Sequence, residues 1–133
     1  MNTEGLAVLV ADDEADMRQL VTRTLMASGR VRTVVSAANG AEAVAKAEEA
    51  VPDAVVLDIS MPVMDGREAL PRLRRLCPNS AIVVFSSRPS PHLLAELLEA
   101  GADAICDKAS GIYELLAVLW TVVDRRAGAG GSG

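Results

Sequence analysis

The sequence predicts a single α/β domain, with a doubly wound parallel β-sheet of five strands and five helices. Short, continuous apolar runs such as Leu6–Val10 and Ala54–Leu57 are typical of strands buried on both faces of a sheet. These runs alternate with segments of helical periodicity, which is the order that parallel strands with right-handed crossovers require. The chain has 133 residues, half of them hydrophobic, and is therefore long enough to bury a sizeable core.

The first half of the chain contains three predicted strands, at Leu6–Val10, Val31–Ala37 and Ala54–Leu57. The second of these mixes valine with arginine and threonine, as an edge strand would. Helical spacing of apolar residues predicts a helix over 15–28, which Gly29 ends. A second helix follows the turn signal Asn39-Gly40 and is closed by Pro52.

The second half contains two more predicted strands, at Ala81–Phe85 and Ala104–Cys106. Leucines at helical spacing predict a third helix around Leu70–Leu76. Pro71 would remove one of its backbone hydrogen bonds, so we expect a late start or a kink. The fourth helix has Ser90 as its N-cap, Pro91 in its first turn and Gly101 at its end.

The last predicted helix covers Ile112–Val123, and 128–133 form a flexible Gly/Ser tail or the start of a linker. No apolar run reaches the roughly 18 residues of a membrane span, so we expect a soluble, cytoplasmic protein. Cys77 and Cys106 match no metal-ligand spacing and are interpreted as buried, reduced thiols.

The charge of the chain is unevenly distributed. Residues 1–66 contain 11 acidic and 5 basic residues, whereas 67–133 contain 7 acidic and 8 basic residues. An acidic first half argues against a nucleic-acid-binding surface on this domain. It favours a site for a cation.

Polar side chains follow four of the predicted strands. Asp12 and Asp13 come after the first strand, Asp58 after the third, Ser86 after the fourth and Lys108 after the fifth. Because the carboxyl ends of parallel strands lie at one edge of a sheet, we expect these side chains to meet there.

The chemistry of these side chains indicates phosphoryl transfer. Three adjacent acids after the first strand are consistent on their own with either a solvated helix start or a cation site. With Asp58 beside them, they would bind a hard divalent cation such as Mg2+. Lys108 suits a phosphate oxygen or Asp58 itself, and the hydroxyl of Ser86 suits a second phosphate oxygen. A carboxylate nucleophile, a metal and two such donors form a phosphoryl-transfer site.

These motifs resemble the receiver domain of two-component response regulators. The most specific of them is Asp58-Ile59-Ser60-Met61-Pro62-Val63-Met64-Asp65-Gly66, and Val10–Glu14, Ser86 and Asp107-Lys108 follow the family's order. The resemblance covers about residues 5–127. It implies a flavodoxin-like fold with strand order 2-1-3-4-5.

The resemblance also implies the roles of the site residues. Asp58 would accept a phosphoryl group from the phosphohistidine of a sensor histidine kinase. Asp13 would ligate Mg2+ directly together with Asp58 and the backbone carbonyl of Ser60, and Asp12 would support the ion through water. Such a domain is a regulatory phosphoacceptor and not an enzyme, and phosphorylation changes its interaction surface.

Two other interpretations account for the site less well. A degenerate receiver, used only for interaction, would not need every acidic and cationic site residue. A phosphatase with an aspartyl intermediate usually needs a second aspartate two residues after the nucleophile, and that position is Ser60. Nucleotide binding is excluded because neither a G-x-G-x-x-G nor a P-loop pattern occurs.

Three positions depart from the family pattern. Ala109 follows Lys108 where the family usually has proline, often in a cis bond. Ile105 replaces an aromatic residue that rotates on activation in many members, so we expect switching here without such a rotation. Arg88 is an unusual long cation near the site.

The last helix has an apolar arc wider than one-sided packing needs, because Tyr113 and Trp120 extend it. These two residues either lean on neighbouring helices or form a contact surface. Receivers often pair through the fourth helix, fifth strand and fifth helix, and we expect weak homodimerisation or effector contact there. A C-terminal effector domain beyond this chain is a further expected partner. Neither nucleic acid nor a membrane is expected to contact this domain.

Overall fold

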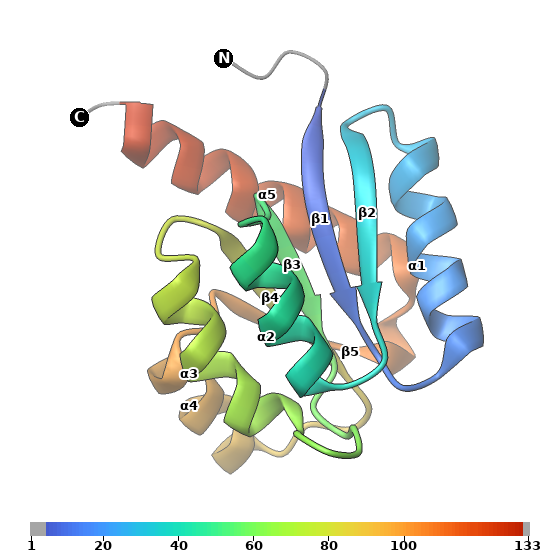
Figure 1. The fold of residues 1–133 in the computed structure, drawn as a ribbon, viewed down its shortest axis with the longest axis vertical. Coiled ribbons are helices and arrows are strands. Elements are labelled where there is room, and N and C mark those ends of the chain that lie inside the picture. Colours follow the sequence, from blue (N-terminus) through green and yellow to red (C-terminus); the bar gives the residue numbers. More distant parts are fainter. Residues whose placement is uncertain (1–4, 132–133) are drawn as a thin grey trace.

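The structure, a computed structural model, describes residues 5–131, and these form a parallel five-stranded sheet between two layers of helices (Figure 1). The strands are β1 (Leu6–Ala11), β2 (Val31–Ala37), β3 (Ala54–Leu57), β4 (Ala81–Ser86) and β5 (Ala104–Asp107). Their order across the sheet is β2-β1-β3-β4-β5, which confirms the flavodoxin-like arrangement. The predicted strands are correct to within one residue at their ends.

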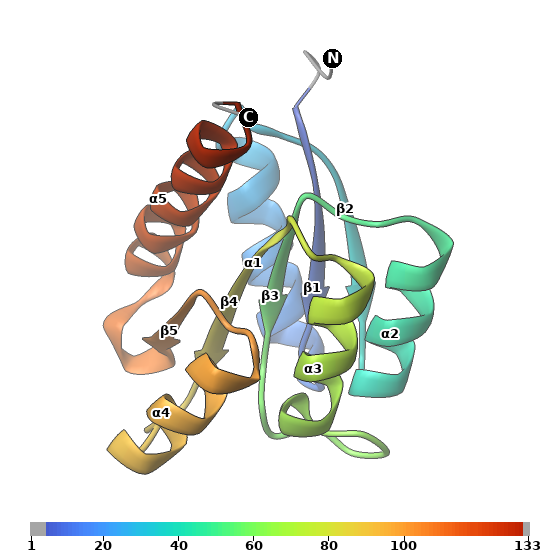
Figure 2. The same cartoon turned by 90° about the vertical axis from the view of Figure 1, so that its left-hand side faces the viewer.

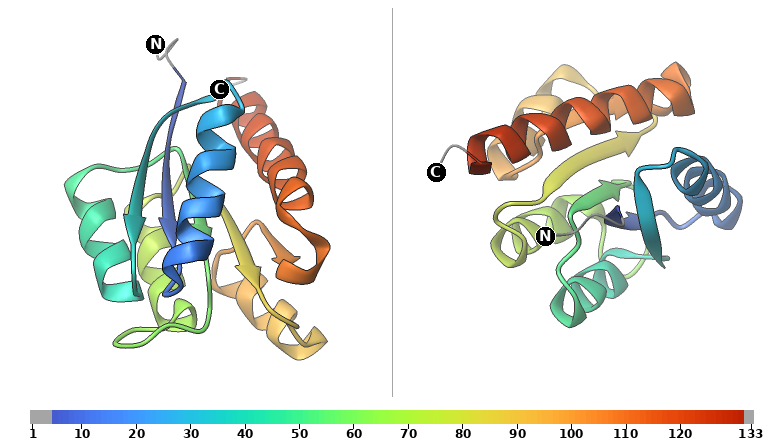
Figure 3. Two further views of the ribbon diagram at one scale, coloured as in Figure 1. Left: turned by 90° about the vertical axis from the view of Figure 1, so that its right-hand side faces the viewer. Right: turned by 90° about the horizontal axis from the view of Figure 1, so that it is seen from above.

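Two helices cover one face of the sheet and three cover the other (Figures 2 and 3). The first pair is α1 (Ala15–Ala27) and α5 (Ile112–Gly131); the others are α2 (Gly40–Glu49), α3 (Gly66–Leu76) and α4 (Pro91–Ala100). A short 3-10 turn, Lys108–Ser110, links β5 to α5. Because every strand is parallel to its neighbours, all the strands end at the same edge of the sheet.

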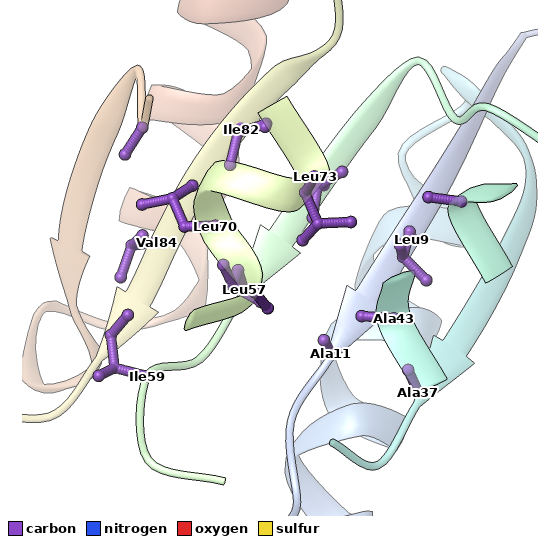
Figure 4. Packing of buried hydrophobic residues seen from close by; sticks show 14 of the residues in the cluster. Leu9, Ala11, Ala37, Ala43, Leu57, Ile59, Leu70, Leu73, Ile82 and Val84 are labelled. Carbon is purple, nitrogen blue, oxygen red and sulfur yellow. The ribbon is translucent and has the colours of Figure 1, made fainter. Parts of the chain in front are cut away.

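Each face of the sheet has its own apolar core, because successive strand residues point to opposite faces. On the face of α2 and α3, Leu9 and Leu57 pack with Leu70 and Leu73 (Figure 4). On the face of α1 and α5, the buried residues include Val8, Val10, Val56, Val83, Leu25, Leu115 and Leu119. Burial on both sides explains why the central strands read as continuous apolar runs.

Side-chain caps fix the starts of α2 and α4, and the predicted cap of α4, Ser90, is confirmed. The Ser90 Oγ accepts a hydrogen bond from the Leu93 N–H at 3.1 Å, with Pro91 as the first residue of α4. At α2, the Asn39 side chain accepts from the Glu42 N–H at 2.9 Å. These side chains satisfy amide donors that have no partner within their own helix.

Pro71 lies inside α3, and the predicted late start of that helix is wrong. The helix begins at Gly66, where the Asp65 side chain caps it by accepting from the Glu68 N–H at 3.0 Å. Pro71 lacks an N–H, so it removes one internal bond but does not end a helix that is capped and packed on the sheet.

Helix α5 is longer than the sequence predicts. It continues past Val123 to Gly131, into the stretch expected to be a Gly/Ser tail. Near its end, the Arg126 guanidinium donates to both oxygens of Asp103 at 2.6–3.0 Å, which fixes the helix just before its first glycine, Gly128. The remaining tail residues, 132–133, lie outside the described residues.

The two cysteines are buried and free, as predicted. Burial raises the pKa of both thiols, that of Cys106 with a smaller contribution from Glu114. Within residues 5–131, no helix has the length and apolar character needed to span a membrane.

Candidate functional site

The predicted site residues come together at the carboxyl edge of the sheet. Asp12 follows β1, Asp58 follows β3, Ser86 ends β4 and Lys108 follows β5. Three of these residues, Asp12, Asp58 and Ser86, are buried although they are polar. The sheet therefore holds polar groups at its rim where water cannot fully solvate them.

The sheet ladder continues directly into the two buried carboxylates. The Asp12 N–H donates to the carbonyl of Ala37 at 3.1 Å, and the Asp58 N–H donates to that of Ala11 at 2.9 Å. Both aspartates therefore start from backbone that is held by neighbouring strands. This arrangement limits how far their carboxylates can move apart.

Three carboxylates form a tight cluster. Oxygen atoms of Asp12, Asp13 and Asp58 all lie within 4.8 Å of one another. Asp12 is 3% exposed and Asp58 is 4% exposed, whereas Asp13 is exposed. Like charges this close repel one another, and burial strengthens the repulsion because little water screens it.

Lys108 partly compensates this cluster. Its Nζ lies 2.8 Å from Asp12 Oδ2, 3.2 Å from Asp58 Oδ2 and 3.6 Å from Glu14 Oε1. The contact with Asp58 is one of the two that the sequence suggested, whereas the closer contact with Asp12 was not predicted. Among residues 5–131, no other cation forms an ion pair with Asp12 or Asp58 within 4.0 Å.

The electrostatic balance at the site disfavours the charged form of Asp58. Burial raises the pKa of Asp58, the neighbouring Asp12 raises it further, and together they outweigh Lys108 and the Ile59 N–H that donates to Oδ1 at 2.7 Å. Burial alone would lower the pKa of Lys108, but its contacts with Asp12 and Asp58 reverse this, and its pKa is raised. Lys108 therefore stays charged while Asp58 is short of positive charge.

The donor set fits a hard divalent cation. The cluster offers oxygen ligands alone, from three residues on two strand ends, and Mg2+ prefers such ligands. Ser60, whose backbone carbonyl the resemblance implies as a ligand, is exposed in the loop between β3 and α3. Ser86 is buried at the end of β4, where it pairs with Asp107 of β5.

The positions that depart from the family pattern have simple local roles. The Ala109 N–H donates to Asp107 Oδ1 at 2.9 Å, a bond that proline could not make, and no peptide bond in the described chain is cis. Ile105 is partly buried and packs against the core under α2 to α4. Arg88 has a left-handed backbone, with φ of 49°, in the loop that follows Ser86.

The predicted location of the aromatic contact surface on α5 is wrong. The Trp120 ring lies 4.7 Å from the Arg30 guanidinium, and Tyr113, 79% exposed, lines a hollow with Arg23, Thr24 and Ala27 of α1. The side of α5 toward β5 carries Glu114 and Val118 instead. Tyr113 and Trp120 therefore flank α1 and not the face formed by α4, β5 and α5.

Two features at the ends of the sheet were missed by the sequence analysis. At the amino edge, Asp103 pairs with Arg74 at 2.9 Å and with Arg126 at 2.6 Å. At the carboxyl edge, the Gly40 N–H at the start of α2 donates to the carbonyl of Met64 at 2.7 Å. The ion pairs of Asp103 and the hydrogen bond of Gly40 each link residues more than 20 positions apart. No spacing of residues in the sequence predicts these contacts.

A family model described as the response regulator receiver domain matches residues 8–119 of this chain. The chain therefore belongs to the receiver-domain family of two-component response regulators. This agrees with the motifs of the sequence and with the acidic edge of the sheet.

Relatives with known names are similar over most of the chain. The transcriptional regulatory protein PrrA of Mycobacterium tuberculosis is 40% identical over 119 residues, which are 90% of this chain and 50% of that protein. The chemotaxis protein CheY of Thermotoga maritima is 37% identical over 98 residues, 74% of this chain and 81% of that protein. A protein-glutamate methylesterase/protein-glutamine glutaminase of Bacillus licheniformis is 38% identical, but the match covers 30% of its length.

Solved structures show the same fold. A CheY-like receiver domain of Methanospirillum hungatei superposes with a TM-score of 0.87 at 26% identity, covering 94% of this chain and 98% of that one. The chemotaxis protein CheY4 of Vibrio cholerae gives 0.81 at 33% identity, covering 89% and 98%. The chain thus spans nearly all of these domains but only half or less of the longer relatives.

Proposed function

We propose that this domain is a phosphorylation-dependent signalling switch, in which Asp58 accepts a phosphoryl group from the phosphohistidine of a sensor histidine kinase. One observation carries the proposal. Asp58 is a buried carboxylate at a strand end, flanked by a second carboxylate and a lysine, and its pKa is raised. Such a group is fixed in place and short of positive charge, as a nucleophile toward an anionic phosphoryl group would be before its metal binds.

We assign Mg2+ as the cofactor. Asp13, Asp58 and the backbone carbonyl of Ser60 would hold it directly, and Asp12 would support it through water. When bound, Mg2+ would offset the repulsion among the carboxylates and draw negative charge from the phosphoryl oxygens. The family resemblance supplies the division of roles between Asp12 and Asp13.

The chain's own residues account for the transfer. A carboxylate oxygen of Asp58 forms a bond to phosphorus while the bond from phosphorus to the donor's imidazole nitrogen breaks, and the imidazole leaves with that electron pair. Lys108 already contacts Asp58, so its ammonium needs to move little to reach a phosphoryl oxygen. The hydroxyl of Ser86 is the donor for another oxygen.

Phosphorylation then changes the surface near β4 and α4. Ser86 would move toward the phosphoryl group and displace the loop over 87–90, which leads into α4 at Pro91. The altered surface would be read by an output partner, either an effector domain in a longer protein or a separate protein. The receiver unit, 5–127, would then act as a regulatory phosphoacceptor and not as an enzyme with an external substrate.

The test is phosphorylation by a small donor. The protein is incubated with acetyl phosphate and Mg2+, and its intact mass is measured. We expect one phosphate adduct in the wild type and in Asp124→Asn, a matched change at the opposite edge of the sheet. The adduct should be lost in Asp58→Ala and without Mg2+. An adduct of undiminished yield in Asp58→Ala would contradict the proposal.

A further inference from the structure

The loop between β3 and α3 is held by backbone hydrogen bonds from residues that have no side chain. This loop contains Ser60. The Gly40 N–H donates to the carbonyl of Met64 at 2.7 Å, and the Gly66 N–H donates to the carbonyl of Ile59 at 2.9 Å. The first part of the loop, at Ile59, is thus tied to its own helix α3, and the last part, at Met64, is tied to the start of α2 (Figure 2).

Glycine is required at position 40 because the backbones approach so closely. A Cβ atom on Gly40 would overlap the carbonyl oxygen of Met64 and would lie 3.0 Å from both the carbonyl carbon and Cγ of that residue. The main obstacle is backbone, which cannot rotate away as a side chain can. Any larger residue at position 40 would push the loop away from α2.

The loop is strained at Val63, the residue before Met64, whose carbonyl accepts the hydrogen bond from Gly40. Val63 has φ of 66°, a conformation that costs most for β-branched residues, and it is 84% exposed. The Met64 N–H donates to the carbonyl of Pro62 at 2.7 Å, closing a three-residue turn around Val63. An exposed valine has no packing of its own that would hold such a turn, so contacts elsewhere must hold it.

We propose that Gly40 is a positioning residue for the metal site. Its N–H holds Met64, and through it the strained loop, in the conformation from which the Ser60 carbonyl can serve as a ligand. This inference rests on the proposed function, because it requires that Mg2+ bind at the carboxylates and Ser60. It assigns to α2, a helix that contributes no ligand, a part in setting metal affinity.

The test compares two glycine substitutions. Gly40→Ala adds a methyl group against the loop, whereas Gly29→Ala, at the far end of α1, strains the backbone at φ of 81° with open space around it. Mg2+ affinity is measured by calorimetry on folded protein. Loss of a group that supports a ligand typically costs about tenfold to a hundredfold in metal affinity, and we expect this for Gly40→Ala. Gly29→Ala should lose thermal stability and keep its Mg2+ affinity.

A second readout separates positioning from general damage. In Gly40→Ala, the Mg2+ concentration for half-maximal phosphorylation by acetyl phosphate should rise by the same factor, while the rate at saturating Mg2+ recovers toward the wild-type value. Unchanged Mg2+ affinity in folded Gly40→Ala would overturn the inference and leave the proposed function intact. Absence of Mg2+ binding by the wild type would overturn both.

If Gly40→Ala does not fold, amide hydrogen exchange in the wild type tests whether Gly40 supports the metal site. Mg2+ should slow exchange of the Gly40 and Gly66 amide protons, because a ligand that binds the ordered loop disfavours its opening. The Ser28 amide, which donates to Leu25 at the end of α1, should be unaffected. If Mg2+ does not change the exchange rate of the Gly40 amide proton, the inference is overturned.

Discussion

The two edges of the sheet carry charge clusters of opposite composition. At the carboxyl edge, one cation, Lys108, faces the buried carboxylates of Asp12 and Asp58. At the amino edge, one carboxylate, Asp103, faces two cations, Arg74 and Arg126. Both clusters are largely shielded from water, so the difference between them lies in how completely their charges are compensated.

The carboxylate of the amino edge, Asp103, is fully compensated by its two cations. Burial alone would raise the pKa of Asp103, but hydrogen bonds from Arg126 and the Ile82 N–H, together with the charge of Arg74, lower it. Arg74 also donates to the backbone carbonyls that surround it, those of Cys77, Pro78, Ser80 and Gly101. This edge ties α3, α5 and the start of β5 together. Positive charge is in excess here, because burial and the neighbouring Arg126 lower the pKa of Arg74 and Asp103 only partly offsets them.

The carboxyl edge is left short of one positive charge. Burial raises the pKa of Asp58 as it would that of Asp103, but Asp12 adds to the effect and a single lysine does not reverse it. Burial alone therefore does not decide the pKa of a carboxylate in this protein. Asp58 differs from Asp103 because its negative charge is not fully compensated by neighbouring cations. A bound cation would supply the missing positive charge.

The largest expected effect is at the amino edge. Asp103→Ala would leave two partly buried arginines without their carboxylate, and breaking such a pair costs about 3 kcal/mol of unfolding free energy. Denaturant unfolding measures this, with Asp124→Ala as the control because Asp124 forms an exposed pair with Arg30. A loss no larger than that of the control would show that the amino edge is not an anchor.

A smaller loss is expected from Lys108→Met. It removes the cation that pairs with Asp12 and Asp58 and should cost about 2 kcal/mol, since these carboxylates stay buried. Mg2+ should restore part of this loss, because it can offset the same repulsion. Unfolding with Mg2+ and with a chelator measures the recovery; recovery in Asp103→Ala as well would show that it is not specific to this edge.

Asp58→Asn should change the free energy of unfolding in the opposite direction, toward greater stability. Without Mg2+ it removes a carboxylate that is poorly compensated, so we expect the protein to become more stable by about 1 kcal/mol, a typical size for one substitution. Asp103→Asn at the other edge should be destabilising in the same buffer. If both substitutions destabilise the protein alike, the contrast between the edges is wrong.

The smallest expected difference is in pH dependence. The pKa of Asp103 is lowered by folding, so its contribution is fully present above its unfolded pKa of about 3.9 and is lost as pH falls through the lower folded value. The stability gap between wild type and Asp103→Asn should therefore be constant from neutral pH to mildly acidic pH and shrink below it. Urea unfolding across this range checks the sign, and a gap that widens toward low pH would contradict it.

The sequence predicts most of the fold and the residues of the candidate site. Both follow from the spacing of apolar residues and from the topology of a parallel sheet. Apolar runs locate the strands, and parallel strands must bring Asp12, Asp58, Ser86 and Lys108 to one edge. Local caps are also readable, as Ser90 shows. These features depend on residues near one another in the chain or on a rule that all parallel sheets obey.

What the sequence does not predict depends on side-chain packing between distant elements. Arg74 reads as a solvated residue near the end of a helix, yet it reaches Asp103, 29 positions away. Trp120 lies under Arg30, so it flanks α1, and periodicity alone cannot say which neighbour a helix flank will meet. Likewise, Gly40 belongs to the turn signal Asn39-Gly40, which accounts for a glycine there without its contact with Met64.

The central claim, that the carboxyl edge lacks a charge that a divalent cation supplies, is tested most directly by the unfolding free energies of wild type and Asp58→Asn as Mg2+ is added. Stability gained from a ligand grows with its concentration relative to its dissociation constant. We expect Asp58→Asn to be the more stable protein without Mg2+ and the less stable one at saturating Mg2+, so that the two curves cross. Equal gains in both proteins, with no crossing, would contradict the account.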